Sequence, residues 1–158
     1  MYSGSCQMAH VDILASLSWG RTAKLVLEAL ASARAGEGPI LVAGAPGLAR
    51  VLAARGQSVL VFLTALVGGK GHGGRALRGR LDLLPVDDRA LAGIVVRSDE
   101  PRGDVEWRRV VRPGGAVILV AGGPAVEQSR RALCAGLVDV EQRRAGRLIV
   151  TSGRISGH

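Results

Sequence analysis

The sequence predicts one α/β domain with a mostly parallel sheet, helices on both faces and an antiparallel hairpin at its C-terminal end. Short apolar runs alternate with helical patterns that end in glycine, which is the order of β–α–β units. Two final strand-like runs are separated only by Ala145-Gly146, as in a hairpin. A length of 158 residues is typical of a single domain, here residues 1–158.

The N-terminal part is predicted to hold a loose tail over residues 1–10 and helices over 11–35. The clearest helix covers residues 21–34, where apolar side chains recur at i, i+3, i+4 and i+7. These side chains are Ala23, Val26, Leu27 and Leu30. Gly36 and Pro39 then end the helix, because glycine and proline commonly follow a helix C-terminus.

A β–α–β unit is expected next. The apolar runs 40–43 and 58–62 are typical of buried strands, and residues 48–55 between them are typical of a helix that Gly56 ends. The turn that leads from the first strand into this helix reads Gly44-Ala-Pro-Gly47. Such a glycine turn is shared by many nucleotide-binding folds, so it is a weak signal by itself.

The middle of the chain contains a basic, glycine-rich segment at residues 68–80, which we expect to be a mobile loop. It has four cations and no acid, so any binding of nucleic acid there should be weak, non-specific and sensitive to salt. The cations are Lys70, Arg75, Arg78 and Arg80. Short strands are predicted after it, over residues 81–84 and 93–96.

The C-terminal third begins with a predicted helix over residues 104–111, which the run Arg112-Pro-Gly-Gly115 ends. Residues 116–121 form an apolar run typical of a buried strand, and residues 125–135 should form a helix. We expect Cys134, on that helix, to be a small buried apolar residue. The hairpin strands are predicted over 138–143 and 147–152.

The composition argues against several classes of function. The net charge is +8, but the arginines are scattered over most of the chain, which argues against a dedicated nucleic-acid surface. Cys6 and Cys134 have no CxxC partner and no histidine at ligand spacing, so neither a disulfide nor a metal site is expected. The longest apolar run, 59–67, is far shorter than the ~20 residues of a membrane helix. We therefore expect a cytoplasmic protein that does not bind membranes.

Three stretches have a familiar order. Leu84-Pro85 and an acidic turn precede a Val-rich strand, and Arg109-Val-Val-Arg-Pro-Gly-Gly115 precedes the strongest apolar run. Upstream, residues 40–56 read as strand, glycine turn and helix. Over about residues 20–152 the chain resembles the class I S-adenosylmethionine-dependent methyltransferases, whose first strand, cofactor loop and Arg-Pro-Gly-Gly segment these stretches match.

The resemblance implies a Rossmann-like methyltransferase fold with a seven-stranded sheet, and a ligand site at the carboxyl ends of the parallel strands. It assigns cofactor-binding roles to Gly44, Gly47 and Asp82, the last near the adenine amino group, if the site is functional. No residue is indicated as catalytic, and no residue is indicated as a metal ligand.

The chain departs from the family at several site positions. Val42 stands where the family has an acid before its glycine loop. Pro46 has no backbone N–H, so the loop has one hydrogen-bond donor fewer. Ala92 stands in place of an aspartate before the fourth strand. No acid is found where the family binds the ribose hydroxyls, at Phe62, Leu63 or Thr64. We expect side chains of Val42, Phe62 or residues 63–67 to fill the space of the adenosine.

Three functions are compatible with the sequence. We favour a non-catalytic methyltransferase-like protein that needs no cofactor and acts as an interaction or scaffolding module, with a protein partner or as a homo-oligomer. The alternative is a small active methyltransferase that holds S-adenosylmethionine mainly through backbone groups. A third candidate is another dinucleotide binder, since Gly44-x-x-Gly47 before a helix also resembles a nicotinamide fingerprint.

Overall fold

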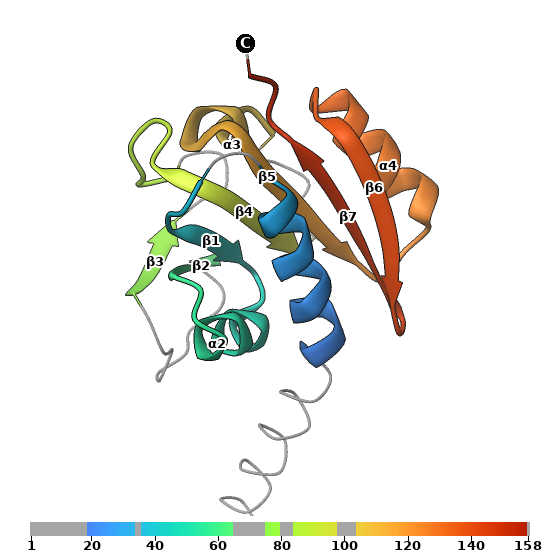
Figure 1. The fold of residues 1–158 in the computed structure, drawn as a ribbon, viewed down its shortest axis with the longest axis horizontal. Coiled ribbons are helices and arrows are strands. Elements are labelled where there is room, and N and C mark those ends of the chain that lie inside the picture. Colours follow the sequence, from blue (N-terminus) through green and yellow to red (C-terminus); the bar gives the residue numbers. More distant parts are fainter. Residues whose placement is uncertain (1–18, 34–35, 65–74, 80–83, 98–103, 158) are drawn as a thin grey trace, which may run out of the picture.

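A sheet of seven strands, with helices on both sides, organises the chain (Figure 1). The computed structural model describes residues 19–33, 36–64, 75–79, 84–97 and 104–157. The strands are β1 (Ile40–Ala43), β2 (Val59–Thr64), β3 (Arg75–Gly79), β4 (Leu91–Arg97), β5 (Val111–Ala121), β6 (Val138–Ala145) and β7 (Leu148–Arg154). The helices are the N-terminal helix (residues 19–32), α2 (Pro46–Ala54), α3 (Asp104–Val110) and α4 (Ala125–Cys134).

The strand order is β3-β2-β1-β4-β5-β7-β6. The pairs from β3 to β5 are all parallel, and β7 pairs antiparallel with both β5 and β6. The order reverses between β1 and β4, so the carboxyl ends of these two strands mark the switch point where open α/β sheets bind ligands. The predicted fold, a mostly parallel seven-stranded sheet with an antiparallel C-terminal hairpin, is confirmed.

The core lies in two layers, because side chains alternate between the faces of each strand. Ile40 and Val42 of β1 pack toward the N-terminal helix and α2. Leu41 and Ala43 of the same strand pack in the opposite layer, with Trp107 of α3. The predicted covering of both sheet faces by helices is therefore confirmed, and Trp107, fully buried, anchors the second layer.

The third strand lies at a different place from the one predicted. Arg75–Gly79 pairs in parallel with β2, so these five residues are strand rather than part of a mobile loop. Leu84, the end of the predicted 81–84 strand, is not in a strand, and residues 81–83 lie outside the described part. Backbone pairing makes an edge strand, and this requires no apolar pattern in the side chains. The expected tail, the first predicted helix and the rest of the glycine segment also lie outside the described residues.

The Arg-Pro-Gly-Gly run was predicted as a separate turn, but it continues β5 as an irregular stretch. The register with β4 shifts from Leu91–Val111 to Gly93–Ala116 across it. Gly114 has a φ of 81°, in the left-handed region, as the turn chemistry predicts. A Cβ on Gly115 would lie 2.7 Å from the Ala92 carbonyl oxygen and 2.5 Å from a Val111 methyl carbon. Both glycines are therefore required by the backbone.

The C-terminal hairpin is confirmed, with Gly146 at a φ of 64° in its two-residue turn. Cys134, predicted to be buried, is exposed. The reason is that α4 buries only Ala132 among its own residues, and Cys134 lies on the exposed side of the helix with Leu133. No helix in the described part of the chain is long and apolar enough to cross a membrane.

Candidate functional site

The candidate site lies where β1, β2 and β4 end, beside the glycine turn that enters α2. Gly44 follows β1 directly and has a φ of 77°, which side-chain-bearing residues rarely adopt. Its N–H donates a hydrogen bond to the Phe62 carbonyl at 3.3 Å. A Cβ on Gly44 would lie 3.4 Å from the Cβ of Arg97, the last residue of β4. Glycine at this position is therefore explained by the turn.

Gly47 lies in the first turn of α2 and contacts the indole of Trp19. A Cβ on Gly47 would lie only 2.6 Å from Trp19 Nε1 and 2.9 Å from Trp19 Cδ1, distances that real Cβ atoms do not reach. Trp19 comes from the start of the N-terminal helix, 28 positions earlier in the chain. The space above Gly47 is thus occupied by a side chain, and the glycine allows the two helices to approach closely.

The N-terminus of α2 has few partners of its own. Ala45 occupies the cap position without a side-chain hydrogen bond, and Pro46 follows it. The first turn of the helix contains no acid. The positive end of the helix dipole is therefore not neutralised within the helix, which favours an anionic group nearby.

The positions where the chain departs from the methyltransferase family fall into two groups. Val42 and Phe62 are fully buried, Val42 under α2 and Phe62 in the opposite layer, so both are core residues. Ala92 lies near the amino end of β4, where its N–H donates to the Pro39 carbonyl at 2.9 Å, away from the carboxyl edge. Asp82 and the segment 65–67 lie outside the described residues, so their predicted roles stay predictions.

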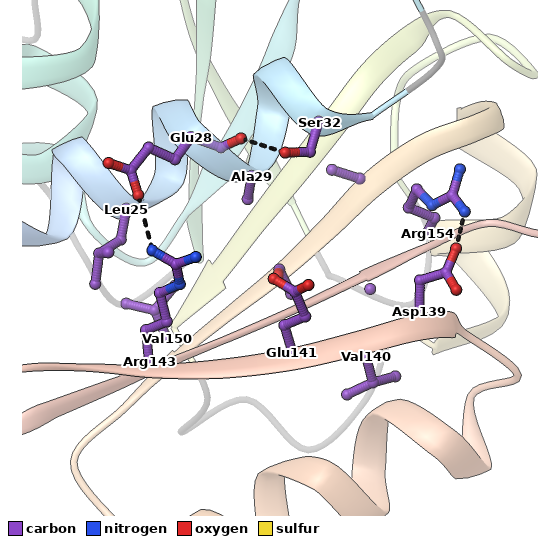
Figure 2. Close-up of a pocket in the computed structure, with 13 residues that line it drawn as sticks. Leu25, Glu28, Ala29, Ser32, Asp139, Val140, Glu141, Arg143, Val150 and Arg154 are labelled. Carbon is purple, nitrogen blue, oxygen red and sulfur yellow. Dashed lines mark hydrogen bonds and ion pairs between the residues drawn. The ribbon is translucent and has the colours of Figure 1, made fainter.

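Two cavities that the described residues form lie elsewhere. One of about 430 Å³ lies between the N-terminal helix and the β6–β7 hairpin, and Figure 2 shows its charged lining. Another, of about 690 Å³, lies near the amino ends of β1 and β2, beside Gly38 and Gln57. Neither cavity includes Gly44 or Gly47. Within the described part, no group of three His, Cys, Asp or Glu residues is placed to hold a metal ion.

The family-like stretch at residues 84–115 is held together by one arginine that the sequence did not single out. Arg109 donates to both carboxylate oxygens of Glu106 at 2.7 and 2.8 Å, and to Asp88 at 2.8 Å. It also donates to the carbonyls of Leu84 and Val86, both at 2.8 Å. Hydrogen bonds to Glu106 and then to Asp88 raise the pKa of Arg109 above its ordinary value. We call Arg109, Glu106 and the loop 84–90 the arginine clamp.

Glu106 completes the arginine clamp from the protein interior. It is buried, with only 8% of its surface exposed, and its Oε2 accepts a hydrogen bond from the Leu84 N–H at 2.8 Å. The i, i+3 spacing of Glu106 and Arg109, with acids at 87 and 88 upstream, is the sequence signal that this contact leaves. The Leu-Pro turn is thus fixed onto α3 by polar contacts.

Other arginines of the same stretch also bind backbone carbonyls. Arg112 donates to the Glu37 carbonyl at 2.9 Å, and Arg108 donates to the Ala135 carbonyl at 2.8 Å, just beyond the end of α4. The guanidinium of Arg131 lies 5.2 Å from the centre of the Trp107 ring. Much of the basic charge near α3 therefore serves internal contacts.

The fold is shared with solved methyltransferases. No protein-family model matches the chain, and a search of curated proteins found no match. A putative S-adenosyl-L-methionine-dependent methyltransferase from Methanococcus maripaludis has a TM-score of 0.66 and 12% identity, over 99% of this chain and 94% of that one. A possible histamine N-methyltransferase from Thermotoga maritima has a TM-score of 0.68 and 14% identity, over 98% and 95% of the two chains.

A third similar structure is the complex between the Haloferax volcanii Trm112 methyltransferase activator and a putative methyltransferase. Its TM-score is 0.59 at 16% identity, over 83% of this chain and 88% of that one. At such identities the likeness concerns the fold. The chain therefore has the fold of the class I S-adenosylmethionine-dependent methyltransferases, as the sequence resemblance implied.

Proposed function

We propose that this protein is a methyltransferase-fold protein with a degraded cofactor site, which acts without catalysis as an interaction or scaffolding module. The observation that carries the proposal is the contact of Trp19 with Gly47, together with the left-handed backbone conformation of Gly44. The Trp19 indole occupies the position where a Cβ of Gly47 would point, and Gly44 has a backbone conformation that favours glycine. Packing and turn geometry account for both glycines without a ligand.

The fit of S-adenosylmethionine is poor for a second reason. An acid that accepts hydrogen bonds from the ribose contributes ~1.5–3 kcal/mol for each bond to a charged group. The residues at the end of β2 are Phe62, Leu63 and Thr64, none of which is acidic. Losing ~3 kcal/mol would weaken binding about 100-fold. Pro46 removes one further backbone donor from the loop.

The alternative, an active methyltransferase, has its own support. Similar structures include a geranyl diphosphate methyltransferase in complex with S-adenosylmethionine and a Burkholderia thailandensis methyltransferase with bound S-adenosylhomocysteine. Methyl transfer depends largely on positioning, so the missing catalytic residue weighs less than the missing cofactor contacts. The unneutralised N-terminus of α2 would also favour an anionic group of a ligand.

Calorimetric titration with S-adenosylmethionine and with S-adenosylhomocysteine distinguishes the two functions. We expect millimolar binding or none for the natural chain. A second measurement uses Trp107→Phe, which leaves Trp19 as the sole tryptophan, so that its fluorescence reports any ligand reaching Gly47. Low-micromolar binding of either ligand, with a change in Trp19 emission, would overturn the proposal in favour of the enzyme.

The proposal requires that the protein binds a partner. The Haloferax complex with Trm112 supports the idea that a chain of this fold serves as one half of a protein assembly. Nucleic acid remains a weaker candidate, through non-specific contacts that increasing salt should abolish. Retention of a partner from native extract at moderate salt, with no retention of DNA or RNA, is the expected result. Sequence-selective nucleic-acid binding at high salt would contradict it.

A further inference from the structure

We propose that the chain forms a two-fold symmetric dimer in which β6 pairs antiparallel with β6 of a second copy. β6 is the last strand in the sheet order, so β7 occupies one of its edges and no described strand occupies the other. Figure 1 shows β6 and α4 beside each other at this end of the sheet. The inference is independent of whether the protein binds a cofactor.

The charges of β6 are arranged for pairing with themselves. Asp139 and Glu141 lie in the first half of the strand, and Arg143 and Arg144 lie in the second half. Edge strands commonly carry charges of one sign, which repel a second copy. In an antiparallel pair of β6 strands, the acidic half of each copy instead faces the basic half of the other, and unlike charges directly opposite stabilise a strand pair.

The hairpin register determines which backbone groups of β6 face the free edge. The two-residue turn makes Ala145 and Leu148 the pair that closes the hairpin, and residues that exchange hydrogen bonds then alternate along the antiparallel ladder. The N–H and C=O groups of Gln142 and Arg144 therefore point away from β7, toward the free edge. The 3.0 Å hydrogen bond between the Gln142 and Thr151 side chains fits this assignment, because side chains lie closest in pairs that exchange no backbone bonds.

A two-fold axis at Gln142 is the register that the charges favour. It pairs Gln142 with its own copy through the outward backbone groups, and places Glu141 opposite Arg143 of the second copy, twice. Moving the axis by one residue centres the dimer on Glu141 or on Arg143, which sets like charges against each other. Hydrogen-bond geometry permits each of these axes, and charge favours the one at Gln142.

The side chains are free to make these contacts. Figure 2 shows Glu141 between the Arg143–Glu28 and Arg154–Asp139 ion pairs, and Glu141 has no ion pair within the described part of the chain. Arg143 and Glu28 lie 3.2 Å apart and are 61% and 47% exposed, so their pair is weak. Arg143 is therefore available to Glu141 of a second copy at little cost.

The helix above β6 supports the same axis. α4 contacts both β6 and β7, and the Gln142 side chain donates to the Ala125 carbonyl at 2.7 Å. This bond sets the first turn of α4 beside the proposed axis, where Val126 is 78% exposed. With strands ~4.8 Å apart, a helix midway between β6 and β7 lies ~10 Å from its copy, the usual distance of packed helices. The dimer would bury Val126 there.

The test uses charge reversal and exchange. We expect the natural chain to sediment at twice 16.4 kDa, and Glu141→Arg and Arg143→Glu each to weaken the dimer at least ~10-fold through like-charge contacts. The double variant Glu141→Arg/Arg143→Glu restores both opposite-charge pairs, and so does mixing the two single variants. Either experiment should recover the dimer.

Matched controls make the same charge changes on other surfaces. Glu37→Arg and Arg21→Glu lie on exposed positions outside the hairpin, and should leave the dimer unchanged. Circular dichroism checks that every variant folds. A natural chain that stays monomeric at all concentrations would overturn the proposal. A dimer that resists both single reversals, or that the double variant does not restore, would overturn it as well.

Discussion

The arginine clamp and the glycine turn at Gly44–Gly47 both resemble the same family in sequence, yet they differ in what surrounds them. In the clamp, every polar group that we describe has a partner, from the Glu106 carboxylate to the Leu84 N–H. At the glycine turn, the first helical turn has no acid and the cap has no side-chain hydrogen bond. Two motifs that resemble one family can thus differ in whether the fold itself binds their polar groups.

The largest effect on stability should come from Gly115, in the stretch that the arginine clamp adjoins. Gly115→Val places a side chain within 3 Å of two backbone oxygens, those of Ala92 and Arg112. We expect a loss of about 3 kcal/mol in the free energy of unfolding, measured by urea denaturation. The added side chain has no free space, so the surrounding backbone must shift. Gly123→Val is the control, since a Cβ at Gly123 meets no atom within 4 Å. Equal stability of the two variants would refute the packing argument.

The clamp itself gives the next effect. Glu106→Ala removes the acceptor of the buried Leu84 N–H, and an unsatisfied buried donor costs about 2 kcal/mol. Asp88→Ala removes the other carboxylate of Arg109, but its side chain is 75% exposed, so its loss should change stability by less than ~0.5 kcal/mol. If the Asp88 variant proved the less stable, the clamp would be an exposed ion pair rather than a buried contact.

The smallest effect should appear at the glycine turn, and it should change sign with the background. Gly47→Ala meets the Trp19 indole, so it should destabilise the natural chain by about 1 kcal/mol. In a Trp19→Ala background, the same change should stabilise by up to ~1 kcal/mol, because alanine is the better helix former. Thermal unfolding of the four chains measures the cycle. Additive effects would show that Trp19 does not restrict Gly47, and would sharpen the case for a ligand there.

The sequence predicted most of the sheet because buried parallel strands are continuous apolar runs. β1, β4 and the regular part of β5 are of this kind, and each was located to within two residues. β3 was missed because its sequence, RALRG, has no such run. α2 was predicted to begin at Leu48, but it begins at Pro46, since proline is well suited to the first helical turn.

The candidate site was less predictable. The left-handed turn at Gly44 follows from local chemistry, and the sequence pointed to that residue. The position of Trp19 against Gly47 depends on how two helices from separate segments pack, which no local pattern contains. The contacts of Arg109 were not predicted for the same reason, because its farthest partner, Leu84, lies 25 positions away in the chain. Both the glycine turn and the arginine clamp therefore depend on long-range contacts that the sequence does not reveal.

The position of β7 has a consequence for the order of assembly. β7 lies between β5 and β6 in the sheet, although it follows both in the chain. During synthesis β5 therefore exposes an unpaired edge while the next 26 residues, 122–147, are made, and β6 has no neighbour until β7 arrives. A local hairpin of β6 and β7 forms faster than a distant pairing, so the two strands should fold together and then dock onto β5 as one unit.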